Sequence, residues 1–217
     1  MKRFLRTTAA ARVSAVLALA AMAFTGTVSL DAHAADSKGN YIVRGIGARP
    51  CSDYMAAVGK SATDVMPYMS WMEGYLTGIN RLQAQTFDVS PVTEAAIVGQ
   101  MVRNYCTTQP TLRFETAVAQ LMNFFAPYKV TAQSQLVEVT VGDARAALRQ
   151  STLKWMQEKL KAQGQFTGTP DGLYGNTTKT ALIAFQKAAK IPETGVPDAR
   201  TLVQFIQNEA QAQGAKP

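Results

Sequence analysis

Glu73 is the residue of this chain whose surroundings suggest acid–base chemistry. It lies between two aromatic residues in the segment Trp71-Met-Glu73-Gly-Tyr75. A carboxyl group held in an apolar cleft has a raised pKa and can act as the general acid that cleaves a glycosidic bond. The alternative is that Glu73 is an ordinary helix residue. We prefer this alternative, because the bundle predicted below for residues 48–127 is small for a glycan cleft.

Few catalytic or metal-binding roles are open to histidine and cysteine, because the chain has one histidine and two cysteines. Its one histidine, His33, falls in the predicted leader. Residues 35–217 therefore lack histidine ligands for a catalytic zinc and a histidine base for a serine or cysteine nucleophile. Cys51 and Cys106 are an even set that most simply forms one disulfide after export. We predict no catalytic residue, no metal, no cofactor and no enzyme activity.

The N-terminus has the form of a secretory signal peptide. A basic start precedes an apolar run at residues 13–24, which is too short to span about 30 Å of hydrocarbon. Ala32-His33-Ala34 is then a small-x-small pattern that signal peptidase accepts. We predict a signal peptide at residues 1–34, cleaved after Ala34, or alternatively after Ala23. No later segment is long and apolar enough to cross a bilayer, so we expect a periplasmic protein without a membrane span.

The charge balance argues against nucleic-acid binding. The chain has a formal net charge of +7, to which residues 1–34 contribute four basic residues and one acidic residue. Of the +4 that remains, +3 lies in residues 131–217, which hold 10 basic and 7 acidic residues. This surplus is too small for a nucleic-acid-binding surface, although it favours contact with an anionic polymer.

Residues 35–130 are predicted to form a helical domain. From Asp64 onward, apolar residues recur at spacings of three and four, which is the period of one buried helix face: Val65, Met69, Met72, Leu76 and Ile79. Further helices are expected at three places: around 51–58, from Ser90-Pro91 to Cys106, and from Pro110 through Phe125. A second stripe on the long helix is aromatic: Tyr68, Trp71 and Tyr75. It is core or, if exposed, a surface for a partner or a glycan.

The helical pattern stops between this domain and the C-terminal region. Residues 131–141 alternate weakly between polar and apolar residues. We interpret residues 131–144 as a linker, or as a lone strand without a partner, and expect helical character to return near Asp143.

The C-terminal region contains a short internal repeat, an echo of one motif, that marks where two helices begin. Residues 172–178 and 195–201 share the form G-x-x-[GD]-x-x-T. Gly175 and Asp198 are placed as N-caps, and Thr178 and Thr201 follow three residues later, where a hydroxyl could reach back to the cap's backbone N–H. Asp171 is expected to fix its loop by accepting from backbone N–H groups two or three residues ahead. The pattern predicts a three-helix unit.

These motifs resemble the type 1 peptidoglycan-binding domain. The residues that carry the likeness are Leu153-x-x-Met156-Gln157, Asp171-Gly172-x-Tyr174-Gly175, Thr178-x-x-Ala181-x-x-x-Phe185-Gln186, and Gly195 with Thr201. The resemblance implies a non-catalytic helical module at residues 145–210, followed by a flexible tail at 211–217, that attaches envelope proteins to peptidoglycan. With the N-terminal bundle, the fold class is all-α.

The N-terminal domain is similar to two groups of small helical periplasmic proteins with one disulfide. These are the HdeA-type acid-stress chaperones and the immunity proteins that block type VI amidase effectors. The likeness rests on the cysteine pair and on aromatic and glycine positions between residues 51 and 106. Residues 35–130 hold only seven acidic residues, which argues against acid-driven chaperoning.

Candidate ligand residues cluster at the loop that opens the second helix of the C-terminal module. A polar wall polymer would meet Asp171, Tyr174 and Thr178 there, with Phe166 and Trp155 as stacking surfaces, although Tyr174 could equally be buried packing. We predict an exported, non-catalytic peptidoglycan-binding protein that tethers a helical module to the wall. That module would bind an envelope protein as inhibitor, chaperone or adaptor. The alternative is a small hydrolase of lysozyme or transglycosylase type that uses Glu73.

Overall fold

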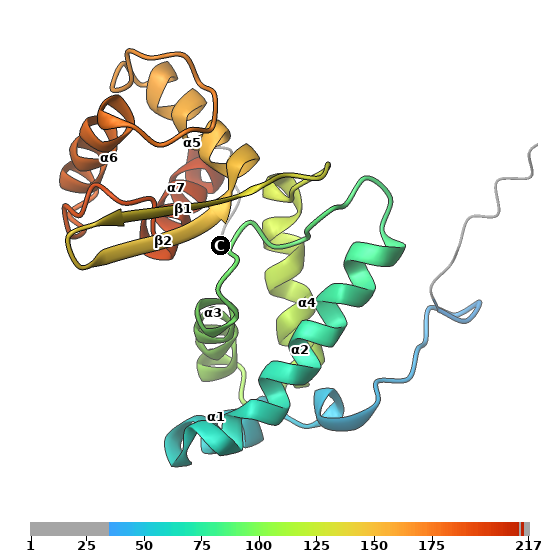
Figure 1. Cartoon of the computed structure of the whole chain (residues 1–217). Coiled ribbons are helices and arrows are strands. Elements are labelled where there is room, and N and C mark those ends of the chain that lie inside the picture. The colour runs from blue at the N-terminus through green and yellow to red at the C-terminus, as the bar shows by residue number, and fades with distance from the viewer. Residues whose placement is uncertain (1–34, 213, 215–217) are drawn as a thin grey trace, which may run out of the picture. The chain divides into compact units, whose positions relative to one another are not determined.

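The computed structural model describes residues 35–212 and 214 (Figure 1). The predicted signal peptide at residues 1–34 lies outside the described residues, as do residues 213 and 215–217 of the predicted tail. Contacts divide the chain into two units, Met1–Tyr41 and Ile42–Pro217, and the helices and strands below all lie in the second. The described part is mostly helical with one two-stranded sheet, which confirms the all-α class.

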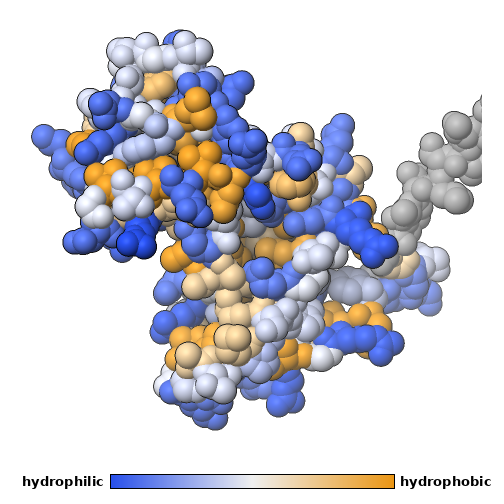
Figure 2. Space-filling model, in the orientation of Figure 1, coloured by the Kyte–Doolittle hydropathy of each residue, from blue (hydrophilic) through white to orange (hydrophobic). Residues whose placement is uncertain are grey.

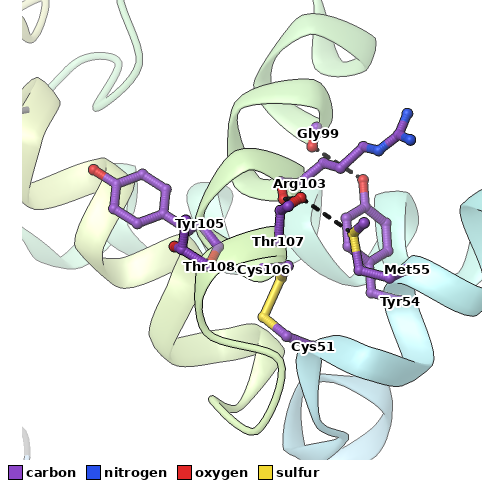
Figure 3. The surroundings of a disulfide bond; sticks show 9 residues. All are labelled: Cys51, Tyr54, Met55, Gly99, Arg103, Tyr105, Cys106, Thr107 and Thr108. Carbon is purple, nitrogen blue, oxygen red and sulfur yellow. Dashed lines mark hydrogen bonds between the residues drawn. A yellow bond between two sulfur atoms is a disulfide. The ribbon is translucent and has the colours of Figure 1, made fainter.

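From residue 35 onward, four α-helices precede the sheet: α1 (Cys51–Lys60), α2 (Ala62–Leu82), α3 (Ala95–Thr108) and α4 (Phe114–Phe125). A 3-10 helix, η1 (Gly45–Ala48), comes before α1, and another, η2 (Ala126–Tyr128), follows α4. The predicted disulfide is confirmed, since Cys51 in the first turn of α1 bonds Cys106 in α3 (Figure 3). Both cysteines are fully buried, so the bond is part of the core of these helices.

The predicted start of α3 at Ser90-Pro91 is wrong, because the helix begins at Ala95. The Ser90 hydroxyl donates to the carbonyl oxygen of Val92 at 2.7 Å and accepts from the backbone N–H of Val92. The Ser90 hydroxyl therefore forms its hydrogen bonds within a turn and does not cap the N-terminus of a helix.

The predicted start of α4 at Pro110 is also wrong, because α4 begins at Phe114. The carbonyl oxygens of Pro110 and Leu112 accept from the backbone N–H groups of Ser52 (2.8 Å) and Cys51 (2.7 Å). The first N–H groups of a helix have no acceptor within that helix, so residues 110–112 supply acceptors for the first turn of α1.

The aromatic stripe of α2 belongs to the core. Tyr68 is 5% exposed, and Trp71 stacks on Tyr75 with ring centroids 5.2 Å apart. The Trp71 indole N–H donates to the Arg44 carbonyl oxygen at 2.9 Å. A side chain at Gly47 would collide with the Trp71 ring, so glycine lets η1 lie against the indole.

A β-hairpin replaces the predicted linker. Strand β1 (Leu136–Val141) pairs antiparallel with β2 (Ala144–Arg149), in a register that sets Leu136 opposite Arg149. The expectations of a strand without a partner and of helical character near Asp143 are therefore wrong. Asp143 lies in the turn, where Gly142 adopts a φ of +58° that glycine tolerates best. The predicted module boundary at residues 144–145 falls inside β2.

Three helices follow the hairpin and form the C-terminal module: α5 (Gln150–Ala162), α6 (Asn176–Ala188) and α7 (Ala199–Ala212) (Figure 1). Phe185 of α6 stacks on Phe205 of α7 with centroids 3.7 Å apart. Lys159 of α5 pairs with Glu209 of α7. The fully buried face of α5 matches the predicted stripe: Leu153, Met156 and Leu160.

Polar contacts connect the loop between α2 and α3 to the hairpin. The Thr93 hydroxyl donates to the Ala147 carbonyl oxygen at 2.6 Å, and an Arg149 guanidinium nitrogen lies 3.7 Å from a carboxylate oxygen of Asp88. Burial raises the pKa of Asp88, and the hydrogen bond from the Ser90 backbone and the charge of Arg149 oppose this rise. Strand β2 is thus bonded to the loop between α2 and α3.

The surface carries both hydrophobic and hydrophilic side chains. Figure 2 shows hydrophobic side chains scattered among hydrophilic ones on the face drawn. The exposed large hydrophobic residues of the described part come from several elements: Tyr41, Ile42, Met66, Leu82, Phe87, Ile97, Leu136 and Leu173. Among the described residues, no helix combines the length and apolar character that crossing a membrane requires.

Candidate functional site

A buried glutamine of α5 holds the loop that leads into α6. The Gln157 side-chain oxygen accepts from the backbone N–H groups of Asp171 (3.0 Å) and Gly172 (2.8 Å). Its side-chain nitrogen donates to the Leu173 carbonyl oxygen (2.9 Å) and to the Thr178 hydroxyl (3.0 Å). Gln157 is 1% exposed, so it replaces water as the partner of these polar groups.

A second glutamine repeats this arrangement one helix later. The Gln186 side-chain oxygen accepts from the Gly195 N–H at 2.8 Å. Its nitrogen donates to the Val196 carbonyl oxygen (3.0 Å) and to the hydroxyls of Thr194 (3.0 Å) and Thr201 (2.9 Å). The internal echo of the sequence is therefore a repeated loop, each copy held by one buried amide. Both glutamines stand in the sequence motif, yet no role was predicted for either.

The two threonines of the echo act differently from the prediction. Thr178 and Thr201 accept from the glutamine amides and donate to the carbonyl oxygens of Leu173 (3.3 Å) and Val196 (3.4 Å), instead of bonding the backbone N–H of the cap. The glutamine amide comes within reach because the loop folds back over the preceding helix.

The predicted caps and the predicted loop bond are confirmed. Gly175 is the N-cap of α6. The Asp198 carboxylate accepts from the Thr201 N–H at 2.8 Å. The Asp171 carboxylate accepts from the Leu173 N–H, also at 2.8 Å.

The candidate ligand residues differ in exposure. Phe166 and Thr178 are buried, and Tyr174 is half-buried with its hydroxyl donating to the Gly195 carbonyl oxygen at 2.6 Å. Burial raises the pKa of Tyr174. Asp171 is exposed and Trp155 is half-buried. Asp171 and Thr178 both bond the Gln157 side chain, whereas Tyr174 reaches across to Gly195 and Phe166 packs in the core.

Two of these candidates, Trp155 and Asp171, line the same pocket of about 620 Å³. One wall is α5, and the other is the segment between η2 and β1, residues 127–135. Sequence reasoning gave this segment no role in a site. The full lining is Pro127 to Gln135, Gln150 to Thr152, Lys154, Trp155 and Asp171.

Hydrogen bonds fix this segment to the start of α5. The Gln150 N–H donates to the Gln135 carbonyl oxygen (2.8 Å), and the Ser151 N–H donates to the Ser134 hydroxyl (2.9 Å). An Arg149 guanidinium nitrogen donates to the Ser134 carbonyl oxygen at 3.3 Å. The two walls are therefore bonded to each other at one end of the pocket.

Glu73 lies on a different and smaller pocket, of about 330 Å³, which Asp88 and Arg149 also line. Its side chain is exposed, while its aromatic neighbours Trp71 and Tyr75 pack on the core side of α2. The apolar cleft that a general acid needs is therefore not formed by these two rings. Within the described residues, no group of three or more His, Cys, Asp or Glu could hold a metal ion.

The comparisons with known proteins bear on the C-terminal module. Residues 149–204 match the family of the putative peptidoglycan binding domain. The match begins at the last residue of β2 and contains both glutamine-held loops, so it supports the resemblance seen in the sequence. It does not include residues 127–135, which form the second wall of the larger pocket. No curated protein and no solved structure matches the chain. The likeness of the N-terminal helices to HdeA-type or immunity proteins stays a prediction.

Proposed function

We propose that this is an exported protein that binds peptidoglycan through its C-terminal module and thereby holds its N-terminal helices at the cell wall. The observation that carries the proposal is the family match at residues 149–204. The loops within this match are held by buried amides, so they present a fixed surface to a polymer. A preformed surface lowers the entropy cost of binding.

Export to the periplasm is supported by two features of the chain. Residues 1–34 have the signal-peptide pattern. The fully buried Cys51–Cys106 disulfide is a bond that persists in oxidising compartments and is rare in the cytosol.

The N-terminal helices would engage an envelope protein as an inhibitor, chaperone or adaptor. Their aromatic stripe is used within the core, so a partner must bind elsewhere on the surface. Exposed apolar side chains on two helices are available for such a contact, Met66 and Leu82 of α2 and Ile97 of α3. Capture of an envelope protein by residues 35–217, and its loss on replacing these side chains, would test this part.

A second candidate function is glycan hydrolysis by Glu73, since Glu73 shares a pocket with the partly buried carboxyl group of Asp88. We expect no hydrolysis, because Glu73 is exposed. Purified wall sacculi incubated with a large excess of residues 35–217 should retain the protein in the pellet and release no soluble muropeptides. Release by the wild type but not by Glu73→Gln would establish a glycosidase. Equal release by both would indicate a contaminating hydrolase and calls for repurification before the comparison is repeated.

A further inference from the structure

We propose that the pocket between residues 127–135 and α5 binds the glycan strand of peptidoglycan, at its N-acetylated amino sugars and not at its peptide stems. This inference rests on the proposed function and names the part of the polymer that the chain would bind. The segment 127–135 lies outside the family match, so this chain adds a wall to the module.

An aromatic pair lines the pocket, and a sugar ring can pack against it. Tyr128 and Trp155 both line the pocket, with ring centroids 5.5 Å apart and an interplanar angle of 61°. Both rings are half-buried and anchored from behind, Trp155 by Phe205 and Tyr128 through a hydroxyl 3.5 Å from the Ile206 carbonyl oxygen. The C–H face of a sugar packs on such a ring, while its hydroxyls stay free for hydrogen bonds.

The indole N–H of Trp155 is free to bind a ligand. Among the described residues it has no hydrogen-bond acceptor, whereas the indole N–H of Trp71 donates to the Arg44 carbonyl oxygen. Trp155 therefore combines an apolar face with an available donor in the same pocket.

The opposite wall offers neutral polar groups. Gln133 and Gln135 are exposed on the segment, and within the described part of the chain neither side chain is hydrogen-bonded to another residue. Each amide both donates and accepts, which suits the hydroxyl and acetamido groups of an amino sugar.

The charges of the pocket nearly cancel, which favours a neutral ligand over the carboxylates of a peptide stem. The Lys129 ammonium group donates to the Thr86 hydroxyl (2.9 Å) and the Ala84 carbonyl oxygen (3.3 Å), and neither of these residues lines the pocket. Lys154 and Asp171 then remain as one positive and one negative charge. The volume of about 620 Å³ lies within the roughly 300–1,000 Å³ of small-molecule sites.

The test is a titration of residues 35–217 with a soluble tetramer of N-acetylglucosamine, followed by tryptophan fluorescence and by calorimetry. The double variant Gln133→Ala/Gln135→Ala should bind about tenfold more weakly, since each lost hydrogen bond weakens binding several-fold. Trp155→Phe keeps a ring against Phe205 but removes the indole donor and the fluorescent reporter of the pocket; calorimetry should show binding weakened by a similar factor. Gln100→Ala removes an exposed amide from α3 and should bind as the wild type does. Circular dichroism would verify that each variant is folded.

The same proteins would be tested with the free stem peptide and with purified sacculi. Saturable binding of the tetramer, weakened about tenfold in the pocket variants only, supports the inference. Binding of the stem peptide alone, or tetramer binding that is unchanged in all the pocket variants, overturns it. If the tetramer does not bind while sacculi still retain the protein, the pocket inference is wrong and the proposed function stands. Tetramer binding without retention by sacculi would support the pocket and contradict the proposed function.

Discussion

Replacing Gln157 by leucine should destabilise the C-terminal module by roughly 2–4 kcal/mol, because several buried polar groups lose their partner at once. The side chain bonds the backbone N–H groups of Asp171 and Gly172 and the carbonyl oxygen of Leu173. Leucine has a similar volume but cannot form these bonds, so the loop must either open to water or keep unsatisfied groups. Urea unfolding of residues 35–217, monitored by circular dichroism, would measure the loss.

Gln204→Leu is the matched control for Gln157→Leu. Gln204 is half-exposed on α7 and donates only to the exposed Asn208 at 2.8 Å. This replacement should change the free energy of unfolding by no more than about 0.5 kcal/mol. Gln186→Leu should resemble Gln157→Leu, because Gln186 holds the second loop in the same way. Equal stability of the wild type and both buried variants would show that the amides do not hold the loops.

Replacing Cys51 and Cys106 together by alanine should lower the free energy of unfolding of the N-terminal helices by roughly 2–5 kcal/mol. The bond joins residues 55 apart in sequence and lies in the buried contact between α1 and α3, beside Tyr54 (Figure 3). Without it, the unfolded chain gains conformational freedom and two small voids remain in the core. Thermal unfolding of the variant and of the wild type, each unreduced, would give the difference.

A thiol assay checks the premise of that comparison. Unfolded, unreduced protein should give no reactive thiol, and reduction should release two equivalents. Free thiols before reduction would mean that the pair is not bonded in the exported protein, and the predicted stability difference would then have no basis.

Helices with strong periodicity could be predicted from the sequence, whereas the hairpin could not. The apolar spacing around Leu153 and Met156 is unambiguous over several turns. Residues 144–149 read Ala-Arg-Ala-Ala-Leu-Arg, which by propensity favours a helix, and only pairing with β1 makes them a strand. The available signal was Gly142-Asp143 after the weakly alternating residues 131–141, a dipeptide that is typical of a hairpin turn.

The site was predictable only where its residues are close in sequence. Asp171 and Thr178 lie within one turn-and-cap motif, and both bond the side chain of Gln157. The pocket of Trp155 needs residues 127–135, which reach α5 through bonds such as Ser151 N–H to the Ser134 hydroxyl. Such a bond between a loop and a helix leaves no periodic pattern. The glutamines were visible as motif residues, but their role depends on how the loops fold back over them.

The central claim is that the C-terminal module binds the cell wall, and sedimentation with purified peptidoglycan sacculi tests it most directly. Residues 35–217 should be used, since a fragment that starts at residue 145 would cut β2 and remove its partner strand. We predict saturable co-sedimentation that soluble muropeptides displace. Retention should also weaken as salt is raised, because part of the attraction comes from the +3 surplus of residues 131–217. Folded protein that stays in the supernatant at low salt would contradict the account.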